Sequence, residues 1–201
     1  MPGIIVPRPK TPPASANSPS TTTERLFIRR MEVENLTDLL EYDGHPMVDR
    51  FRTRNPFSEE EAKEFLCHQR NLSLGTEEWL YLAIILQSQG KMIGTVCCRL
   101  ISETHRQGEI GWFLNPSYHG HGYATEAARA VIDLCFSRLN LHRMTARCYE
   151  LNEPSVRLMD RLGMRREGLF LETANLGGMW HNEYLYVILR RQWVQQRKMT
   201  T

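Results

Sequence analysis

The sequence lacks the features that define several broad classes of protein. Its five cysteines are odd in number and contain no C-x-x-C pair, which argues against a disulfide framework. No apolar run approaches the roughly 18 residues that a membrane-spanning helix needs. The N-terminus has no apolar core of the kind found in signal peptides. We therefore expect reduced thiols, no membrane partner and a cytoplasmic location.

The sequence also lacks a large excess of charge of either sign. The chain has 25 Lys and Arg against 23 Asp and Glu, a net charge of +2. That excess equals the contribution of Arg8 and Lys10, which lie in an N-terminal segment without acidic residues. The balanced remainder gives no electrostatic reason to expect nucleic acid as a partner. With 201 residues, 41% of them hydrophobic, the chain can bury the core of a single domain.

The organisation of the chain follows from changes in its composition. Residues 1–23 are rich in Pro, Ser and Thr, so we expect a disordered tail there. Residues 24–193 should form one domain, and residues 194–201 a C-terminal tail. We expect a monomer or a homodimer.

Helical and strand patterns alternate within the expected domain. A capping box begins a helix at Ser58, where Glu61 stands three residues further on. Strands followed by a strand–helix–strand–helix–strand series indicate an α/β fold with a mixed sheet. The expected helices cover about 33–42, 58–72, 122–139 and 152–162, and the expected strands 25–31, 79–86, 91–101, 109–114, 143–149 and 182–189.

The stretch "HGHGYATEAA", residues 119–128, lies between an expected strand and an expected helix. Its glycines would let a phosphate approach the unpaired amides at the positive end of the helix dipole. A plain turn is the simpler alternative. A metal site would rest on His119 and His121 alone, with no Cys or acidic residue at ligand spacing, so we expect no metal.

A second motif, "NEPSVRLMDRLGM", begins at Asn152, one strand and one helix later. Asn152 can cap a helix that has Pro154 in its first turn, and a plain packing helix is the alternative to a functional role. In this order the two motifs resemble those of the GNAT acetyltransferases, in the branch with ribosomal-protein N-acetyltransferases. The resemblance covers about residues 24–193. One departure is His119, where the family has Arg or Gln.

The resemblance implies a GNAT fold, in which a mixed, mostly antiparallel sheet splays between its central parallel strands and is flanked by helices. Acetyl-CoA would be the cosubstrate, with its pantetheine arm between the strands at 109–114 and 143–149. The residues implied in binding it are Phe113, Leu114, His119, Gly120, His121, Gly122, Tyr123, Ala124, Thr125, Asn152 and Ser155.

The implied activity is transfer of the acetyl group to a primary amine by direct attack. The amine would belong to a protein N-terminus or a small molecule. Such attack needs a neutral amine and a stabilised leaving thiolate. Glu109 is the candidate base, with Glu172 or a water chain as rivals, and Ser155, Tyr184 or Tyr186 is the candidate acid.

Two other functions remain open from the sequence. The first is a non-catalytic domain that binds acyl-CoA as a sensor or scaffold. The second is a nucleotide-phosphate binder on another α/β fold, although no Walker lysine is found. Residues 43–55 and 173–181 are expected to select the acceptor. The first of these segments mixes Asp and Arg, so its charge favours neither a polycation nor a polyanion.

Overall fold

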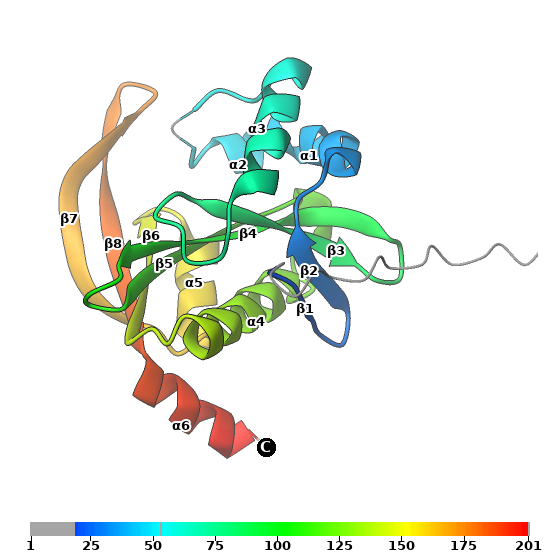
Figure 1. The fold of residues 1–201 in the computed structure, drawn as a ribbon. Helices are drawn as coiled ribbons and strands as arrows, with labels where there is room; N and C mark the ends of the chain where they lie inside the picture. The colour runs from blue at the N-terminus through cyan, green and yellow to red at the C-terminus, as the bar shows by residue number, and fades with distance from the viewer. Residues whose placement is uncertain (1–18, 53, 201) are drawn as a thin grey trace, which may run out of the picture.

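One eight-stranded sheet forms the centre of the molecule (Figure 1). The computed structural model describes residues 19–52 and 54–200. The strand order is β1-β2-β3-β4-β5-β6-β8-β7, and the expected α/β fold with a mixed sheet is confirmed. The strands are β1 (Thr21–Thr22), β2 (Leu26–Arg30), β3 (Leu80–Leu86), β4 (Lys91–Ser102), β5 (Gln107–Leu114), β6 (Arg143–Tyr149), β7 (Arg165–Leu176) and β8 (Met179–Leu189).

Helices cover both faces of this sheet (Figure 1). On one face, Leu39 and Leu66 pack in a cluster with Met92 of β4. On the other face, Val131 and Met159 belong to the larger cluster. The first layer contains α1 (Leu36–Asp43), α2 (Pro46–Asp49) and α3 (Glu59–Asn71), preceded by the 3-10 turn η1 (Val33–Asn35); the second contains α4 (Tyr123–Arg138) and α5 (Glu153–Arg161).

Local sequence signals set the ends of two of these helices. The Ser58 hydroxyl accepts a hydrogen bond from the amide of Glu61, whose carboxylate accepts one from the Ser58 amide. This is the expected capping box. Asn152 caps α5 by accepting from the amide of Ser155. Both caps satisfy amides that lack a partner within the helix.

The sheet opens between β5 and β6. These strands form the one parallel pair among the described residues, and they pair over only three positions, from Gln107↔Arg143 to Glu109↔Thr145. Beyond Glu109 the two strands continue without a shared ladder. We call this opening the fork. It agrees with the splayed strands that were expected at this place.

Several elements were not expected. Thr21–Thr22 pairs with β2, so the prediction of disorder up to residue 23 is wrong for β1. Residues 1–18, the rest of the predicted tail, lie outside the described residues. Helix α6 (Arg190–Thr200) buries Trp193 and continues through most of the expected C-terminal tail. Strand β7 was missed altogether.

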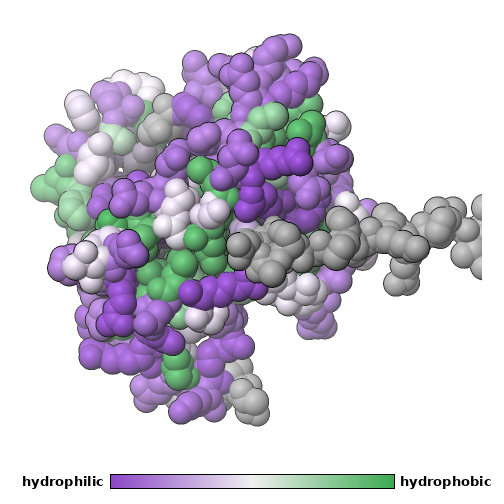
Figure 2. Space-filling view, in the orientation of Figure 1, coloured by the Kyte–Doolittle hydropathy of each residue, from purple (hydrophilic) through white to green (hydrophobic). Residues whose placement is uncertain are grey.

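Strands β7 and β8 form an arm at the edge of the sheet (Figure 1). Residues 173–181, which were expected to select the acceptor, continue this hairpin through its turn at Gly177 and Gly178. The arm exposes Leu171 and Trp180, and hydrophobic side chains gather on this side of the surface (Figure 2). No helix in the described part of the chain is long and apolar enough to cross a membrane.

Candidate active site

A groove with a volume of about 2320 Å³ runs through the fork. Its lining includes the start of α4 and the side of α5, and it continues to α2 on the opposite face of the sheet. Both faces contribute because the missing β5–β6 ladder leaves a passage between them. Of the residues predicted to bind a cofactor, all but His121 line this groove.

The loop before α4 presents free amides to the groove. Gly120 and Gly122 have φ values of 81° and 82°, a conformation that favours glycine. Gly122 is the N-cap of α4 and makes no side-chain cap hydrogen bond. The first helical bond is donated by Glu126, which leaves the amides of Tyr123, Ala124 and Thr125 without helical partners. The loop therefore has the geometry of an anion site.

A polar clamp ties this loop to the N-terminal strands. The Glu126 carboxylate accepts hydrogen bonds from the Thr23 hydroxyl (2.5 Å) and from Arg25 Nε (2.7 Å). Arg25 also donates to the carbonyl of His121 (3.0 Å). Burial raises the pKa of Glu126, but hydrogen bonds from Thr23 and Arg25 outweigh it, so the pKa lies below its usual value. The clamp neutralises a carboxylate that would otherwise repel a phosphate.

The two loop histidines make bonds to main-chain oxygens. His119 Nε2 lies 3.0 Å from the carbonyl oxygen of Leu114, and His121 Nδ1 lies 2.8 Å from that of His119. The His121 ring stacks on Tyr123 with 5.6 Å between centroids. Within the described residues, no group of three or more His, Cys, Asp or Glu could hold a metal ion.

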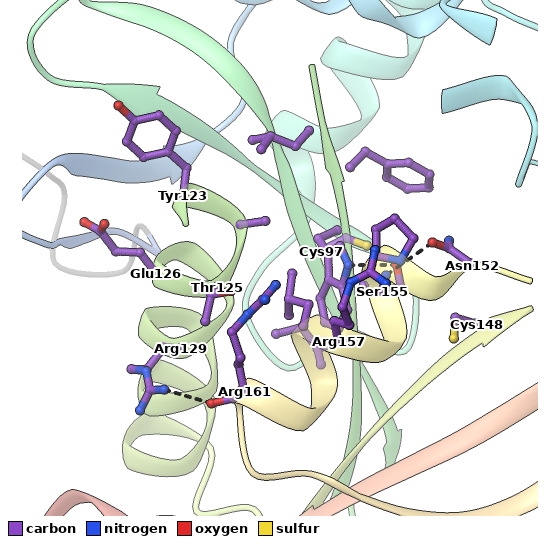
Figure 3. Close-up of a pocket in the computed structure, with 18 of the residues that line it drawn as sticks. Cys97, Tyr123, Thr125, Glu126, Arg129, Cys148, Asn152, Ser155, Arg157 and Arg161 are labelled. Carbon is purple, nitrogen blue, oxygen red and sulfur yellow. Dashed lines mark hydrogen bonds between the residues drawn. The ribbon is translucent and has the colours of Figure 1, made fainter. Parts of the chain in front are cut away.

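Ser155 lies beside the fork in the first turn of α5 (Figure 3). Its hydroxyl oxygen accepts a hydrogen bond from Trp112 Nε1 (3.3 Å), and its amide donates to Asn152 Oδ1 (3.3 Å). With its oxygen occupied by the indole, the hydroxyl can direct its proton into the groove. Ser155 and Asn152 are therefore brought together on the α4–α5 side.

Glu109 lies on the opposite face of the sheet from Ser155. Its neighbour Ile110 packs in the core cluster of α4 and α5, and successive strand residues point to opposite faces. The Glu109 carboxylate is almost fully buried, and Arg99 Nη2 and Nε donate to its Oε2 at 2.6 and 2.9 Å. Arg147 Nε lies 3.7 Å from Oε1. Glu109 and Ser155 thus line the two ends of one passage.

Three other candidate residues lie outside the groove lining. Tyr184 packs against the main core, and the Arg166 guanidinium lies 4.6 Å from its ring centre. Tyr186 is buried beside Tyr184. Glu172 is exposed on β7 with a φ of 50°. The structure does not bring these three side chains together with Glu109 and Ser155.

Two cysteines line the groove, and neither is a good nucleophile. Burial raises the pKa of the Cys97 thiol far above its usual range. Burial and the nearby Glu183 raise the pKa of Cys148 to about 12. A thiol reacts as its thiolate, so both groups stay inert near neutral pH. Neither thiol is therefore a candidate for a covalent intermediate.

Several groove residues were missed by the sequence analysis. Arg25 and Glu126 are about a hundred residues apart in sequence, and the pairing of Arg99 with Glu109 depends on strand register. Trp112 was missed because a tryptophan in a strand usually packs in the core, so its sequence position did not indicate a role in the groove. None of these contacts follows from a local motif.

Comparisons with known proteins agree on one family. The family described as acetyltransferase (GNAT) domain matches residues 25–165. The uncharacterized N-acetyltransferase YnaD of Bacillus subtilis is 37% identical over 172 residues, covering 86% of this chain and 98% of that protein. A GNAT-family acetyltransferase structure from Bacillus anthracis has a TM-score of 0.76 and 33% identity, covering 86% of this chain and 99% of that one.

A more distant structure carries a ligand. It is RimL, a ribosomal L7/L12 alpha-N-protein acetyltransferase in complex with coenzyme A. It has a TM-score of 0.73 and 19% identity, and the alignment covers 86% of this chain and 98% of that one. At this identity the likeness shows the fold alone.

Proposed function

Because this chain belongs to the acetyltransferase (GNAT) family of acyltransferase enzymes, we propose that it moves the acetyl group of acetyl-CoA to a primary amine by direct attack. One observation carries the proposal. A single groove joins the open amides at the start of α4 to the fork and then to the opposite face of the sheet. Such a passage lets two substrates meet from opposite faces.

The cofactor half of the groove fits a coenzyme A. The diphosphate is held by the amides from Gly120 to Thr125, because an added Cβ at Gly120 would meet nothing within 4 Å and the backbone is open to approach. Arg129 and Arg161 line the groove between α4 and α5, where they can bind a further phosphate (Figure 3). The pantetheine arm would lie in the fork, where it could pair with main chain near Phe113.

Acetyl-CoA would supply the thioester that carries the acetyl group, and coenzyme A would leave as the thiol. Glu109 accepts the amine proton at Oε1, directly or through a water, since Oε2 already holds both hydrogen bonds from Arg99. Ser155 donates a hydrogen bond toward the leaving sulfur, and Asn152 and Trp112 orient it. The buried base and the positioned hydroxyl supply general acid–base assistance.

A binding assay and a turnover assay test the proposal together. Coenzyme A should raise the melting temperature through binding linkage, and ATP and NAD should raise it much less at the same concentration. Acetyl-CoA with a panel of amines should then release free thiol in proportion to acetylated amine. Coenzyme A binding without thiol release from any amine would instead support a sensor or scaffold. The absence of a melting shift would refute the cofactor assignment.

A further inference from the structure

Arginines form the charged rim of the groove on the α1–α3 face of the sheet. The rim consists of Arg50, Arg99 and Arg147, which all line the groove. The side chains of Arg99 and Arg147 are 38% and 46% exposed, and Arg50 is exposed as well. Their partners Glu109 and Glu183 expose only 6% and 20% of their side chains. The charge that a ligand meets at this rim is therefore mainly positive.

Arg50 differs from the other arginines of its segment. Arg52 and Arg54 both bind Asp43, at 2.6 and 2.7 Å. Arg50 has no carboxylate at salt-bridge distance among the residues that the structure describes, and its guanidinium lies 5.1 Å from the centre of the Phe51 ring. Its positive charge is thus available to a ligand.

We propose that the acceptor carries an anionic group, a carboxylate or a phosphate, close to the amine that is acetylated. The inference rests on the proposed function, because it takes this end of the groove as the place of the acceptor. Guanidinium groups bind carboxylates and phosphates through paired, charge-assisted hydrogen bonds. A polyamine would need several exposed carboxylates, whereas Glu109 and Glu183 are bound to arginines. Glu150, which also lines the groove, is partly buried and accepts hydrogen bonds from the Asn182 amide.

The positive charge of the rim also favours the neutral form of the acceptor amine. Like charges nearby disfavour an ammonium ion and favour the neutral amine that attacks the thioester. An acceptor that has an amine alone would be repelled by the same charges while it is protonated. An anionic group on the acceptor compensates this repulsion and holds the amine in place. The three arginines of the rim therefore select the acceptor and also favour the neutral amine that gives up its proton to Glu109.

Matched pairs of acceptors test the inference. Phenylalanine is compared with phenylalanine amide, phosphoethanolamine with ethanolamine, and an Ala-Glu peptide with an Ala-Lys peptide, both as C-terminal amides; spermidine is the polycation. With saturating acetyl-CoA, the anionic member of at least one pair should show kcat/KM about tenfold higher or more. The pairs also show whether the anion is a free carboxylate, a phosphate or a side chain. The amide has the less basic amine, so amine availability works against the expected order.

Variants connect this preference to the rim. Arg50→Gln should reduce the ratio between anionic and neutral partners about tenfold, whereas Arg138→Gln, an exposed change outside the groove, should preserve the ratio. Calorimetric titration of the preferred acceptor into the CoA-saturated protein should show the same loss of affinity. Faster turnover of spermidine or of the neutral partners, no turnover of any anionic acceptor, or an unchanged ratio in Arg50→Gln would overturn the inference. Failure of CoA binding would instead refute the proposed function.

Discussion

Arg99 and Glu109 lie opposite each other across the β4–β5 ladder, and Arg99 Nη2 is 2.6 Å from Glu109 Oε2. Glu109 is also the last residue of β5 that pairs with β6, opposite Thr145. The ion pair therefore holds a buried carboxylate at the point where the sheet opens. Because both Arg99 bonds end on Oε2 and Arg147 Nε lies 3.7 Å from Oε1, beyond hydrogen-bond distance, Oε1 remains the oxygen that can take a proton.

Gly122→Val should abolish coenzyme A binding. The added Cβ would lie 3.6 Å from Arg25 Nη2, so a branched side chain would crowd the clamp that holds the loop, and the φ of 82° would add backbone strain of roughly 1–2 kcal/mol. Gly90→Val is the matched control, because Gly90 has a φ of 65° in the β3–β4 turn and does not line the groove. Both variants should lose similar unfolding free energy. Normal calorimetric binding by Gly122→Val would show that this loop does not hold the phosphates.

Glu126→Gln should lower stability in a pH-dependent way. The folded-state pKa of Glu126 lies below its usual value, so the carboxylate contributes stability above its unfolded pKa and loses it as pH falls through the folded pKa. At pH 7 we expect the variant to be less stable by about 1 kcal/mol, since the group is partly exposed. Urea unfolding between pH 7 and pH 3 should show this difference shrink below the usual pKa of 4.5. A difference that grows on acidification would contradict the clamp.

Ser155→Ala should lower kcat by roughly 10²-fold, the lower end for loss of an acid–base group. The variant removes the acceptor of Trp112 Nε1, but Asn152 still caps the backbone amide of residue 155, so coenzyme A affinity should change only a few-fold. Ser155→Thr keeps a hydroxyl and should restore most of the rate. Equal losses in the two variants would assign Ser155 to the packing of α5.

Local signals predicted much of this molecule. The capping box at Ser58 and the Asn152 cap depend on residues within one turn, and both were found where expected. The glycine loop was predicted in the same way, from the order strand, glycines and helix. Such features can be predicted because sequence neighbours alone produce them.

The missed features depend on contacts that no local pattern encodes. Strand β7 is exposed along most of its length, so it lacks the alternation that marks a half-buried strand. The assignment of Glu109 came from a resemblance, and its two arginines became visible only through the register of β4, β5 and β6. Tyr184 was predicted to act at the site, but it packs against the core outside the groove lining.

Glu109→Gln should separate catalysis from structure at the fork. If Oε1 accepts the amine proton, the near-isosteric amide should keep coenzyme A affinity within a few-fold and lower turnover by roughly 10²–10⁴. The loss should lessen as pH rises, because neutral amine becomes abundant and needs less help. The variant also leaves Arg99 without its anion, so unfolding free energy should fall by about 1–3 kcal/mol, and rates are to be measured well below the melting temperature.

Glu172→Gln is the matched control, since this exposed residue of β7 lies outside the groove lining and should leave the pH–rate profile unchanged. A purely structural Glu109 predicts a different result, namely lower stability together with a rate loss that does not depend on pH. The deciding measurement is the pH–rate profile of both variants with one accepted amine. Wild-type turnover by Glu109→Gln at neutral pH would remove Glu109 from the chemistry and assign deprotonation to a water chain in the passage.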